Sequence, residues 1–155
     1  MALTTGQLAP DFRLTGTGDT DFRLHRNMKG KTFILFFYPK NFTPGCTAEA
    51  CGFRDHFEAF RDLDIEVIGI SRDKIESHER FKTQYKLPFL LLSDPDGEVA
   101  RSYEVKMPFL SMNKRTSYLI GPDLRIAAVY ENLLDGGAHI REMIRATSQK
   151  NPQKS

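Results

Sequence analysis

Two cysteines, Cys46 and Cys51, lie five positions apart, and the 155-residue chain has no others. A thiolate is a nucleophile and a metal ligand, and a second thiol nearby can close a disulfide with it. Cys46 directly follows Pro44 and Gly45, so it lies at the start of an expected helix. Helix N-termini stabilise anions. The pair therefore indicates redox turnover at Cys46; the alternative is that Cys46 is a buried, inert apolar residue.

Two side chains close to Cys46 in sequence bear on the state of its thiol. Thr43 is placed to cap the helix, one residue before Pro44 at its first position. Glu49 follows Cys46 by three residues and so shares a helix face with it. A bare carboxylate there opposes a thiolate unless a cation lies nearby. The alternative for Glu49 is a first-turn acid that complements the helix dipole.

The spacing of the cysteines sets a condition on any disulfide between them. In an ideal helix, residues five apart have Cα atoms about 8.7 Å apart, whereas a disulfide needs less than about 7 Å. On an intact helix the first turns must therefore unwind before the cysteines can bond. Gly52 follows directly, and a glycine inside a helix costs about 1 kcal/mol relative to alanine. We predict that residues 46–52 melt locally on oxidation; the alternative for Gly52 is close packing against the sheet.

Other uses of a cysteine pair fit this sequence less well. A structural zinc site takes four ligands, commonly with Cys-x-x-Cys spacing. That spacing, which dithiol oxidoreductases of the thioredoxin type also carry, is absent. The histidines show no ligand pattern; they are His25, His56, His78 and His139. A Cys/His hydrolase stays open, because its histidine can be distant in sequence. We expect no metal and no organic cofactor.

The elements that must position these residues alternate along the chain. Apolar runs predict buried strands at 32–38, 65–70 and 89–92, and a hairpin of strands at 116–120 and 125–130. Helical patterns cover 44–63, 75–85, 98–103 and 138–147. Segments 11–14 and 21–24 predict a further hairpin near the N-terminus.

This order predicts an α/β fold with a central mixed β-sheet flanked by helices and an N-terminal β-hairpin extension. Sites in such folds lie beyond the carboxyl ends of strands. Cys46 falls just beyond the end of the strand at 32–38. The expected topology and the cysteine pair therefore both indicate a functional site just beyond the end of this strand.

Length and composition fit one domain, which we expect over 1–148, followed by a polar tail, 149–155. The net charge is only +2 and the basic residues are scattered, so no nucleic-acid partner is indicated. No apolar run approaches the roughly 18 residues that span a bilayer. The first residues have neither a basic region nor an apolar region typical of a signal peptide, so we expect a cytoplasmic protein with no membrane contact.

The segment Pro39-x-x-x-Thr43-x-x-Cys46 resembles the signature of the peroxiredoxins. Its continuation, Pro44-Gly45-Cys46-Thr47-x-Glu49-x-Cys51, is similar to the atypical 2-Cys branch called bacterioferritin comigratory protein or peroxiredoxin Q. Most of residues 6–145 matches in order, through Ala9-Pro10-Asp11-Phe12 as an opening strand, Gly69-Ile70-Ser71, Leu87-Pro88-Phe89, Leu92-Ser93-Asp94 and Arg115-Thr116-Ser117-Tyr118-Leu119-Ile120. The resemblance implies a thioredoxin-like fold.

The resemblance also implies an antioxidant thiol peroxidase that reduces hydrogen peroxide and organic hydroperoxides. Cys46 would be the peroxidatic nucleophile, which becomes a sulfenic acid. Cys51 would resolve it as an intramolecular disulfide, and a thioredoxin-like dithiol reductant would restore both thiols. The branch is often monomeric, so a monomer is expected, with a weak dimer as the alternative.

Four further side chains receive roles from the same resemblance. Thr43 would hydrogen-bond the thiolate and the peroxide. Arg115 would stabilise the thiolate and the charge that develops on the O–O bond. Pro39 would shield the pocket, and Glu49 would pair with and orient Arg115. The apolar loop 106–114 is shorter than in many members of the branch, and we expect it to line the pocket on the substrate side.

Two rival functions stay open at this point. One is a redox-switched sensor or holdase chaperone, whose disulfide would expose apolar surface. The other is a copper-binding chaperone with a thioredoxin fold. That class favours Cys-x-x-x-Cys, one residue shorter than the spacing of Cys46 and Cys51.

Overall fold

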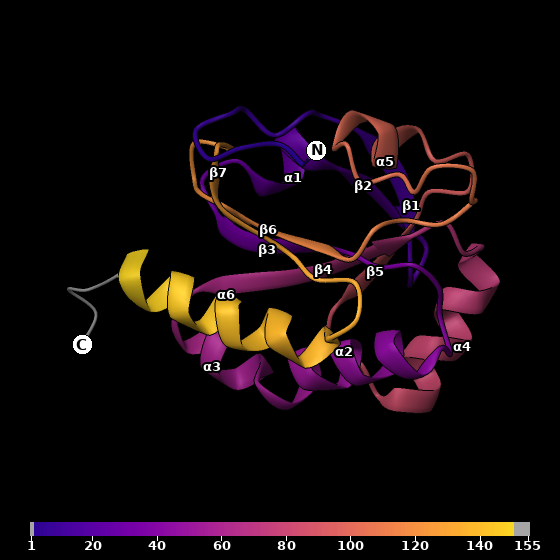
Figure 1. The fold of residues 1–155 in the computed structure, drawn as a ribbon. Coiled ribbons are helices and arrows are strands. Elements are labelled where there is room, and N and C mark those ends of the chain that lie inside the picture. Colours follow the sequence, from indigo (N-terminus) through magenta and orange to yellow (C-terminus); the bar gives the residue numbers. More distant parts are fainter. Residues whose placement is uncertain (1, 151–155) are drawn as a thin grey trace.

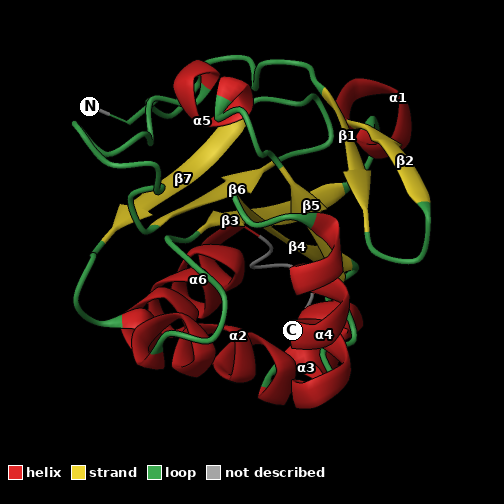
Figure 2. Cartoon of the chain, turned by 90° about the vertical axis from the view of Figure 1, so that its right-hand side faces the viewer, coloured by secondary structure: helices red, strands yellow, loops and turns green. Residues whose placement is uncertain are grey.

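The computed structural model describes residues 2–150 and has a seven-stranded mixed sheet between two layers of helices (Figures 1 and 2). The strand order is β2-β1-β5-β4-β3-β6-β7, in which β3, β4 and β5 run parallel and the remaining pairs antiparallel. The strands are β1 (Arg13–Gly16), β2 (Thr20–Arg23), β3 (Thr32–Phe37), β4 (Ile65–Ser71), β5 (Leu90–Ser93), β6 (Thr116–Ile120) and β7 (Ile126–Glu131). The predicted thioredoxin-like arrangement is confirmed.

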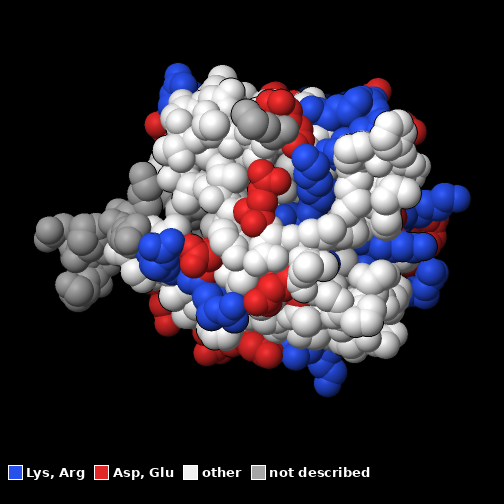
Figure 3. Space-filling view, viewed as in Figure 1, with Lys and Arg blue, Asp and Glu red and all other residues white. Residues whose placement is uncertain are grey.

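Helices cover both faces of the sheet (Figure 1). One face carries α2 (Pro44–Asp55), α3 (Phe57–Asp62), α4 (Ile75–Tyr85) and α6 (Gly136–Lys150); the other carries α1 (Leu24–Met28) and α5 (Glu98–Ser102). None of these helices is long and apolar enough to cross a membrane. Figure 3 shows basic and acidic side chains interspersed over the face that it presents.

Strand β3 is a continuous apolar run because both of its faces are buried. Phe33, Leu35 and Phe37 pack into the cluster under α1 and α5. Ile34 and Phe36 point the other way, into the cluster under α2, α4 and α6. All five side chains are fully buried, as the period of two along a strand requires. The strand is thus held firmly on both sides where it leads to the cysteine loop.

The predicted helix over 44–63 is wrong as one element, because it divides at His56 into α2 and α3. His56 has φ −105° and ψ 11°, outside helical geometry, and its ring nitrogen Nδ1 lies 3.0 Å from the carbonyl oxygen of Gly52. Phe53 and Phe60 both lie in the core, with ring centroids 6.1 Å apart. Their spacing of seven residues fits one face of a continuous helix as well, so the packing of these two rings does not by itself explain the break.

Other boundaries also differ from the expectation. Helix α6 begins two residues earlier and continues to Lys150, into the expected polar tail; the rest of that tail, 151–155, lies outside the described residues. The five-residue α1 was not predicted, since it is too short to show a helical period.

The N-terminal region forms the predicted hairpin but not the expected opening strand. Residues 9–12 lie outside any strand, and Leu8 forms only an isolated bridge with Arg125. Strand β1 pairs antiparallel with β5. The hairpin therefore extends the central sheet along its edge.

Two strand ends bring the chemical residues together. Phe37 at the carboxyl end of β3 pairs with Thr116 at the start of the antiparallel β6. The chain leaving β3 leads into α2, and the residue before β6 is Arg115. Residues distant in sequence therefore meet at this edge of the sheet.

Candidate active site

Cys46 lies in the first turn of α2, as predicted. Pro44 is at the first helical position, and Thr43 has the extended conformation of an N-cap, with φ −82° and ψ 150°. The side chain of Cys46 is buried. Free backbone N–H groups of this turn and the helix dipole both favour an anion at the sulfur.

Arg115 joins Cys46 to Glu49. Its Nη1 donates to Glu49 Oε1 at 2.8 Å and to Cys46 Sγ at 3.4 Å. Its Nε donates to the carbonyl oxygen of Leu133 at 3.0 Å, which fixes the plane of the guanidinium. The side chain of Arg115 is 6% exposed and that of Glu49 is 0% exposed. The structure therefore brings the predicted cation and carboxylate together against the sulfur, away from water.

The charge on Glu49 is set by two opposed effects. Burial raises the pKa of Glu49 to about 8, although the Arg115 guanidinium favours its carboxylate and lowers the pKa. Burial therefore favours the protonated form of this carboxyl group, and Arg115 favours the charged form. The cation that a carboxylate beside a thiolate requires is in place, since Arg115 contacts both side chains.

Thr43 and Pro39 border the site without a direct bond to Cys46. The Thr43 hydroxyl donates to the carbonyl oxygen of Lys40 at 2.8 Å and makes no side-chain cap. Among the described contacts, no hydrogen bond joins Thr43 to Cys46. The predicted hydrogen bond from the Thr43 hydroxyl to the sulfur is therefore not made here, because the hydroxyl donates to Lys40 instead. Pro39 is half-buried directly after β3.

Cys51 lies on the same unbroken helix as Cys46, and both thiols are free. Cys51 is half-buried, and burial raises the pKa of its thiol. Since α2 is intact between the two, their Cα separation is close to the ideal value of about 8.7 Å for that helical spacing. A bond between them needs α2 to unwind first.

Helix α6 packs closely on the start of α2. A Cβ atom on Gly136 would lie 2.7 Å from the carbonyl oxygen of Gly45 and 2.9 Å from Glu49 Cβ. A Cβ atom on Gly52 would lie 2.8 Å from Ile140 Cδ1. Close packing is therefore a sufficient reason for a glycine at position 52, although α6 packs on it and not the sheet.

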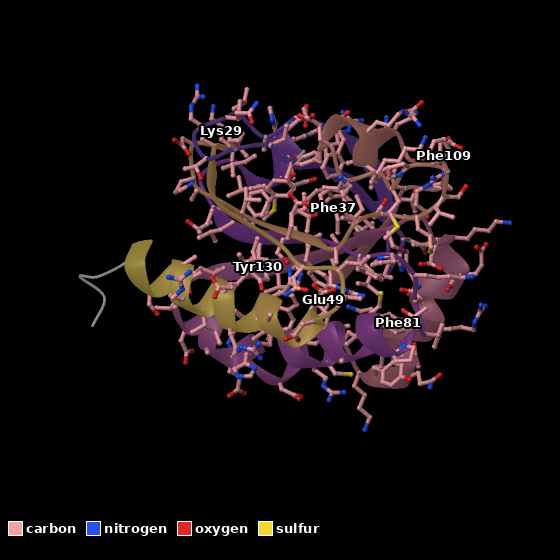
Figure 4. All side chains as sticks on the ribbon, viewed as in Figure 1. Lys29, Phe37, Glu49, Phe81, Phe109 and Tyr130 are labelled. Carbon is pink, nitrogen blue, oxygen red and sulfur yellow. The ribbon has the colours of Figure 1, made fainter. Side chains whose placement is uncertain are left out.

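A cleft of about 510 Å³ borders Arg115 and the loop 106–114. Its lining includes Met107, Pro108, Leu110 and Leu133, so part of the loop lines this cleft, but Cys46 is not among the lining residues. Phe109 at the tip of the loop is fully exposed and lies at the periphery, away from Glu49 (Figure 4). A larger groove, of about 710 Å³, is lined by none of the predicted site residues.

One histidine that the sequence reasoning set aside lies inside the site. His139 on α6 is fully buried, 3.6 Å from Glu49 Oε2 through Nδ1. Ser117 on β6 lies 2.8 Å from the same nitrogen. No spacing in the sequence could have revealed this contact, because 90 residues separate positions 49 and 139. Residues 2–150 contain no group of three side chains suited to hold a metal ion.

Comparisons with known proteins identify relatives of this chain. The model of the AhpC/TSA family matches residues 5–129. The putative peroxiredoxin Bcp of Coxiella burnetii is 40% identical over 150 residues, which cover 93% of this chain and 98% of that protein.

The fold of this chain is also similar to solved structures of related proteins. Peroxidoxin BcpB of Mycobacterium tuberculosis superposes with a TM-score of 0.87 at 32% identity, covering 94% of this chain and 96% of that one. A bacterioferritin comigratory protein of Xanthomonas campestris, described with an alkyl peroxide reduction activity, has a TM-score of 0.82 at 26% identity, covering 90% and 91%.

Proposed function

This chain belongs to the AhpC/TSA family and is a thiol-dependent peroxidase similar to bacterioferritin comigratory protein and peroxiredoxin Q, and we propose that Cys46 is its peroxidatic nucleophile and Cys51 its resolving thiol. The observation that carries the assignment of Cys46 is its contact with a buried guanidinium at a helix N-terminus. Cys51 has neither feature.

The first step oxidises sulfur and reduces peroxide. The Cys46 thiolate attacks the terminal oxygen of the hydroperoxide, so an S–O bond forms while the O–O bond breaks. The products are the Cys46 sulfenic acid and an alkoxide or hydroxide, which takes up a proton to leave as alcohol or water. Arg115 stabilises the thiolate before the step and the charge on the breaking O–O bond during it. Thr43 holds the peroxide once its hydroxyl turns from Lys40, and Pro39 shields the sulfur.

The second step closes the disulfide. The Cys51 thiol attacks the sulfenic sulfur of Cys46, an S–S bond forms and water leaves. Residues 46–52 must unwind for this, which draws Glu49 out of its buried contact with Arg115. A dithiol reductant of the thioredoxin type then reduces the disulfide and returns both thiols. Hydrogen peroxide and organic hydroperoxides are the proposed substrates.

The remaining features of the proposal concern the whole chain. We take 1–148 as one catalytic domain, acting as a monomer in the cytoplasm, with 149–155 as a polar tail. In support of one domain, both core clusters pack against the same continuous sheet.

Peroxide consumption with a thioredoxin system tests the assignment. Cys46→Ser should abolish consumption, whereas Cys51→Ser should still form a sulfenic acid but lose turnover through the intramolecular disulfide. A matched control is His56→Gln, an exposed substitution at the end of α2, which should keep wild-type turnover. Full turnover by Cys46→Ser would overturn the assignment. Oxidation that exposes a client-binding surface without turnover would favour the redox-switched chaperone instead.

A further inference from the structure

The loop between β3 and α2 contains a polar residue, Asn41, that is buried and bonded on every side of its amide. Its Oδ1 accepts from the Tyr38 hydroxyl at 2.6 Å, and its Nδ2 donates to Ser77 Oγ at 3.1 Å and to His78 Nδ1 at 3.0 Å. Its backbone N–H donates to Asp73 Oδ2 at 3.0 Å. The partners lie at the end of β3, just after β4 and on α4. Buried polar networks with all groups bonded fix one arrangement of the chain.

The buried ring of His78 takes its bond from Asn41 as an acceptor. An amide nitrogen only donates, so Nδ1 of His78 must carry the lone pair. The Tyr38 hydroxyl also lies 3.4 Å from Nδ1, but its single hydrogen goes to Asn41, which is nearer. Burial lowers the pKa of His78 and favours the neutral ring that this bond requires. The lone pair of Nδ1 therefore belongs to Asn41 alone.

The residue after Asn41 has a backbone conformation that its side chain disfavours. Phe42 has φ 67°, in the left-handed region that bulky residues rarely adopt. Such a conformation persists only where surrounding contacts hold it. On one side these contacts are the bonds of Asn41. On the other, the ring of Phe42 packs on Phe81 and Tyr85 of α4, with centroids 5.1 and 6.4 Å away. Helix α4 therefore holds both residues that precede Thr43.

The position of Thr43 depends on this loop more than the position of Cys46 does. Thr43 directly follows the left-handed Phe42 and still lies before the first residue of α2. Helix α2 itself is held by its close packing on α6 and by the contact of Arg115 with Cys46 Sγ at 3.4 Å. Release of Asn41 would let Phe42 return to a negative φ and move the Thr43 hydroxyl, while the contacts that hold the sulfur stay in place.

We propose that Asn41 is a positioning residue, whose buried bonds hold the strained loop that places Thr43 toward the peroxide. The inference rests on the proposed function of Cys46 and deepens it. Loss of these bonds should slow the reaction of Cys46 with peroxide by about tenfold, because a small misplacement of a group that holds the substrate is enough for that. Alkylation of the same thiolate should stay near its original rate, because Arg115 and the start of α2 still stabilise it.

The test measures two rates for Cys46 in a Cys51→Ser background, oxidation by hydrogen peroxide and alkylation by iodoacetamide. Asn41→Ala removes all the side-chain bonds of the loop, and Tyr38→Phe removes only the bond to Oδ1 and keeps the ring. Both should slow oxidation and spare alkylation, with the larger effect in Asn41→Ala. Tyr38→Phe keeps the test informative if Asn41→Ala fails to fold.

Tyr118→Phe is the matched control, because it also removes the hydroxyl of a buried tyrosine. That hydroxyl accepts from the backbone N–H of Leu3 at 3.1 Å and donates to the carbonyl oxygen of Tyr103 at 2.7 Å. The ring of Tyr118 packs in the cluster on the opposite face of the sheet from Tyr38. Its loss should leave both rates near those of the reference protein.

A double substitution tests whether Tyr38 acts through Asn41. In Asn41→Ala, the added Tyr38→Phe should slow oxidation no further. A full further effect would overturn the inference. So would unchanged oxidation in both single variants, an equal slowing of alkylation, or an equal slowing of oxidation in Tyr118→Phe. A reference protein whose Cys46 reacts with peroxide no faster than Cys51 does would overturn the proposed function and this inference together, whereas a fast reference with unchanged variants would overturn the inference alone.

Discussion

At the scale of single residues, the stabilisation of the Cys46 thiolate depends on how the Arg115 guanidinium interacts with its two neighbours. Arg115 contacts both the Cys46 sulfur and Glu49. Because all three side chains are buried, the Arg115 guanidinium interacts most strongly with whichever of its two partners is ionised. A charged Glu49 would therefore draw part of the stabilisation by Arg115 away from the Cys46 sulfur.

The raised pKa of Glu49 predicts how stability depends on pH. Glu49 is raised from 4.5 to about 8, so between these values the folded chain holds a proton that the unfolded chain has lost, and stability falls as pH rises. His139, lowered from 6.5 to about 4, has the opposite effect up to pH 6.5. Above that pH the effect of Glu49 stands alone. From pH 6.5 to 8 it amounts to about 2 kcal/mol, at about 1.36 kcal/mol per unit.

Urea denaturation of two variants measures this slope. Both carry Cys46→Ser and Cys51→Ser, which removes the thiols, and one adds Glu49→Gln. The variant that keeps Glu49 should lose stability between pH 6.5 and 8, and the variant with the added Glu49→Gln substitution should not. Equal slopes in the two proteins would show that Glu49 is already ionised at pH 6.5.

At the scale of elements, the contact between α2 and α6 opposes the unwinding that a disulfide requires. Gly136 brings α6 against the backbone of Gly45 and against Glu49 Cβ. Phe53 further along α2 stacks on Phe36 of the sheet, with centroids 4.6 Å apart. The first turns of α2 are therefore held by α6 and by Arg115, and the rest of the helix by the core.

Gly136→Ala should weaken this contact, because its Cβ would meet backbone that cannot easily yield. We expect a loss of about 1–3 kcal/mol in stability. We also expect a larger share of disulfide relative to sulfinic acid after a pulse of peroxide, since α2 opens more readily. Mass spectrometry of the two products measures the ratio.

Gly137→Ala is the matched control, since its Cβ would make only ordinary contacts, the nearest at 3.4 Å from Asp135 Oδ1. It should leave the product ratio near that of the wild type. The same ratio in both alanine variants would contradict the role given to the α2–α6 contact.

At the scale of the whole molecule, opening of α2 is expected to be local. The sheet is packed on both faces and the opposite cluster contains no residue of α2. Amide exchange in residues 46–54 should therefore accelerate on oxidation to the disulfide, while exchange in β3 and β4 stays slow. Unchanged protection of 46–54 in the fully oxidised protein would defeat the predicted melting.

The sequence alone predicted those features of the fold and the site that depend on residues close together in the chain. The buried run of β3, the turn at Pro44 and the motif around Cys46 all show in the chain itself. The break at His56 did not, because the spacing of Phe53 and Phe60 also fits one continuous helix. Neither did the contacts of His139 with Glu49 and Ser117, which exist only because α6 packs on α2 beside β6. Long-range contacts of this kind follow from the topology of the fold, and they produce no characteristic residue spacing in the sequence.

The central claim is that Cys46 is the sulfur that peroxide oxidises. The most direct test is the intact mass of each reduced variant after one equivalent of hydrogen peroxide, with peptide mapping of the modified site. Cys51→Ser should gain one oxygen atom at Cys46, and the wild type should lose two hydrogen atoms as the Cys46–Cys51 disulfide forms. An oxygen gained at Cys51 in Cys46→Ser, as fast as the wild type reacts, would contradict the account.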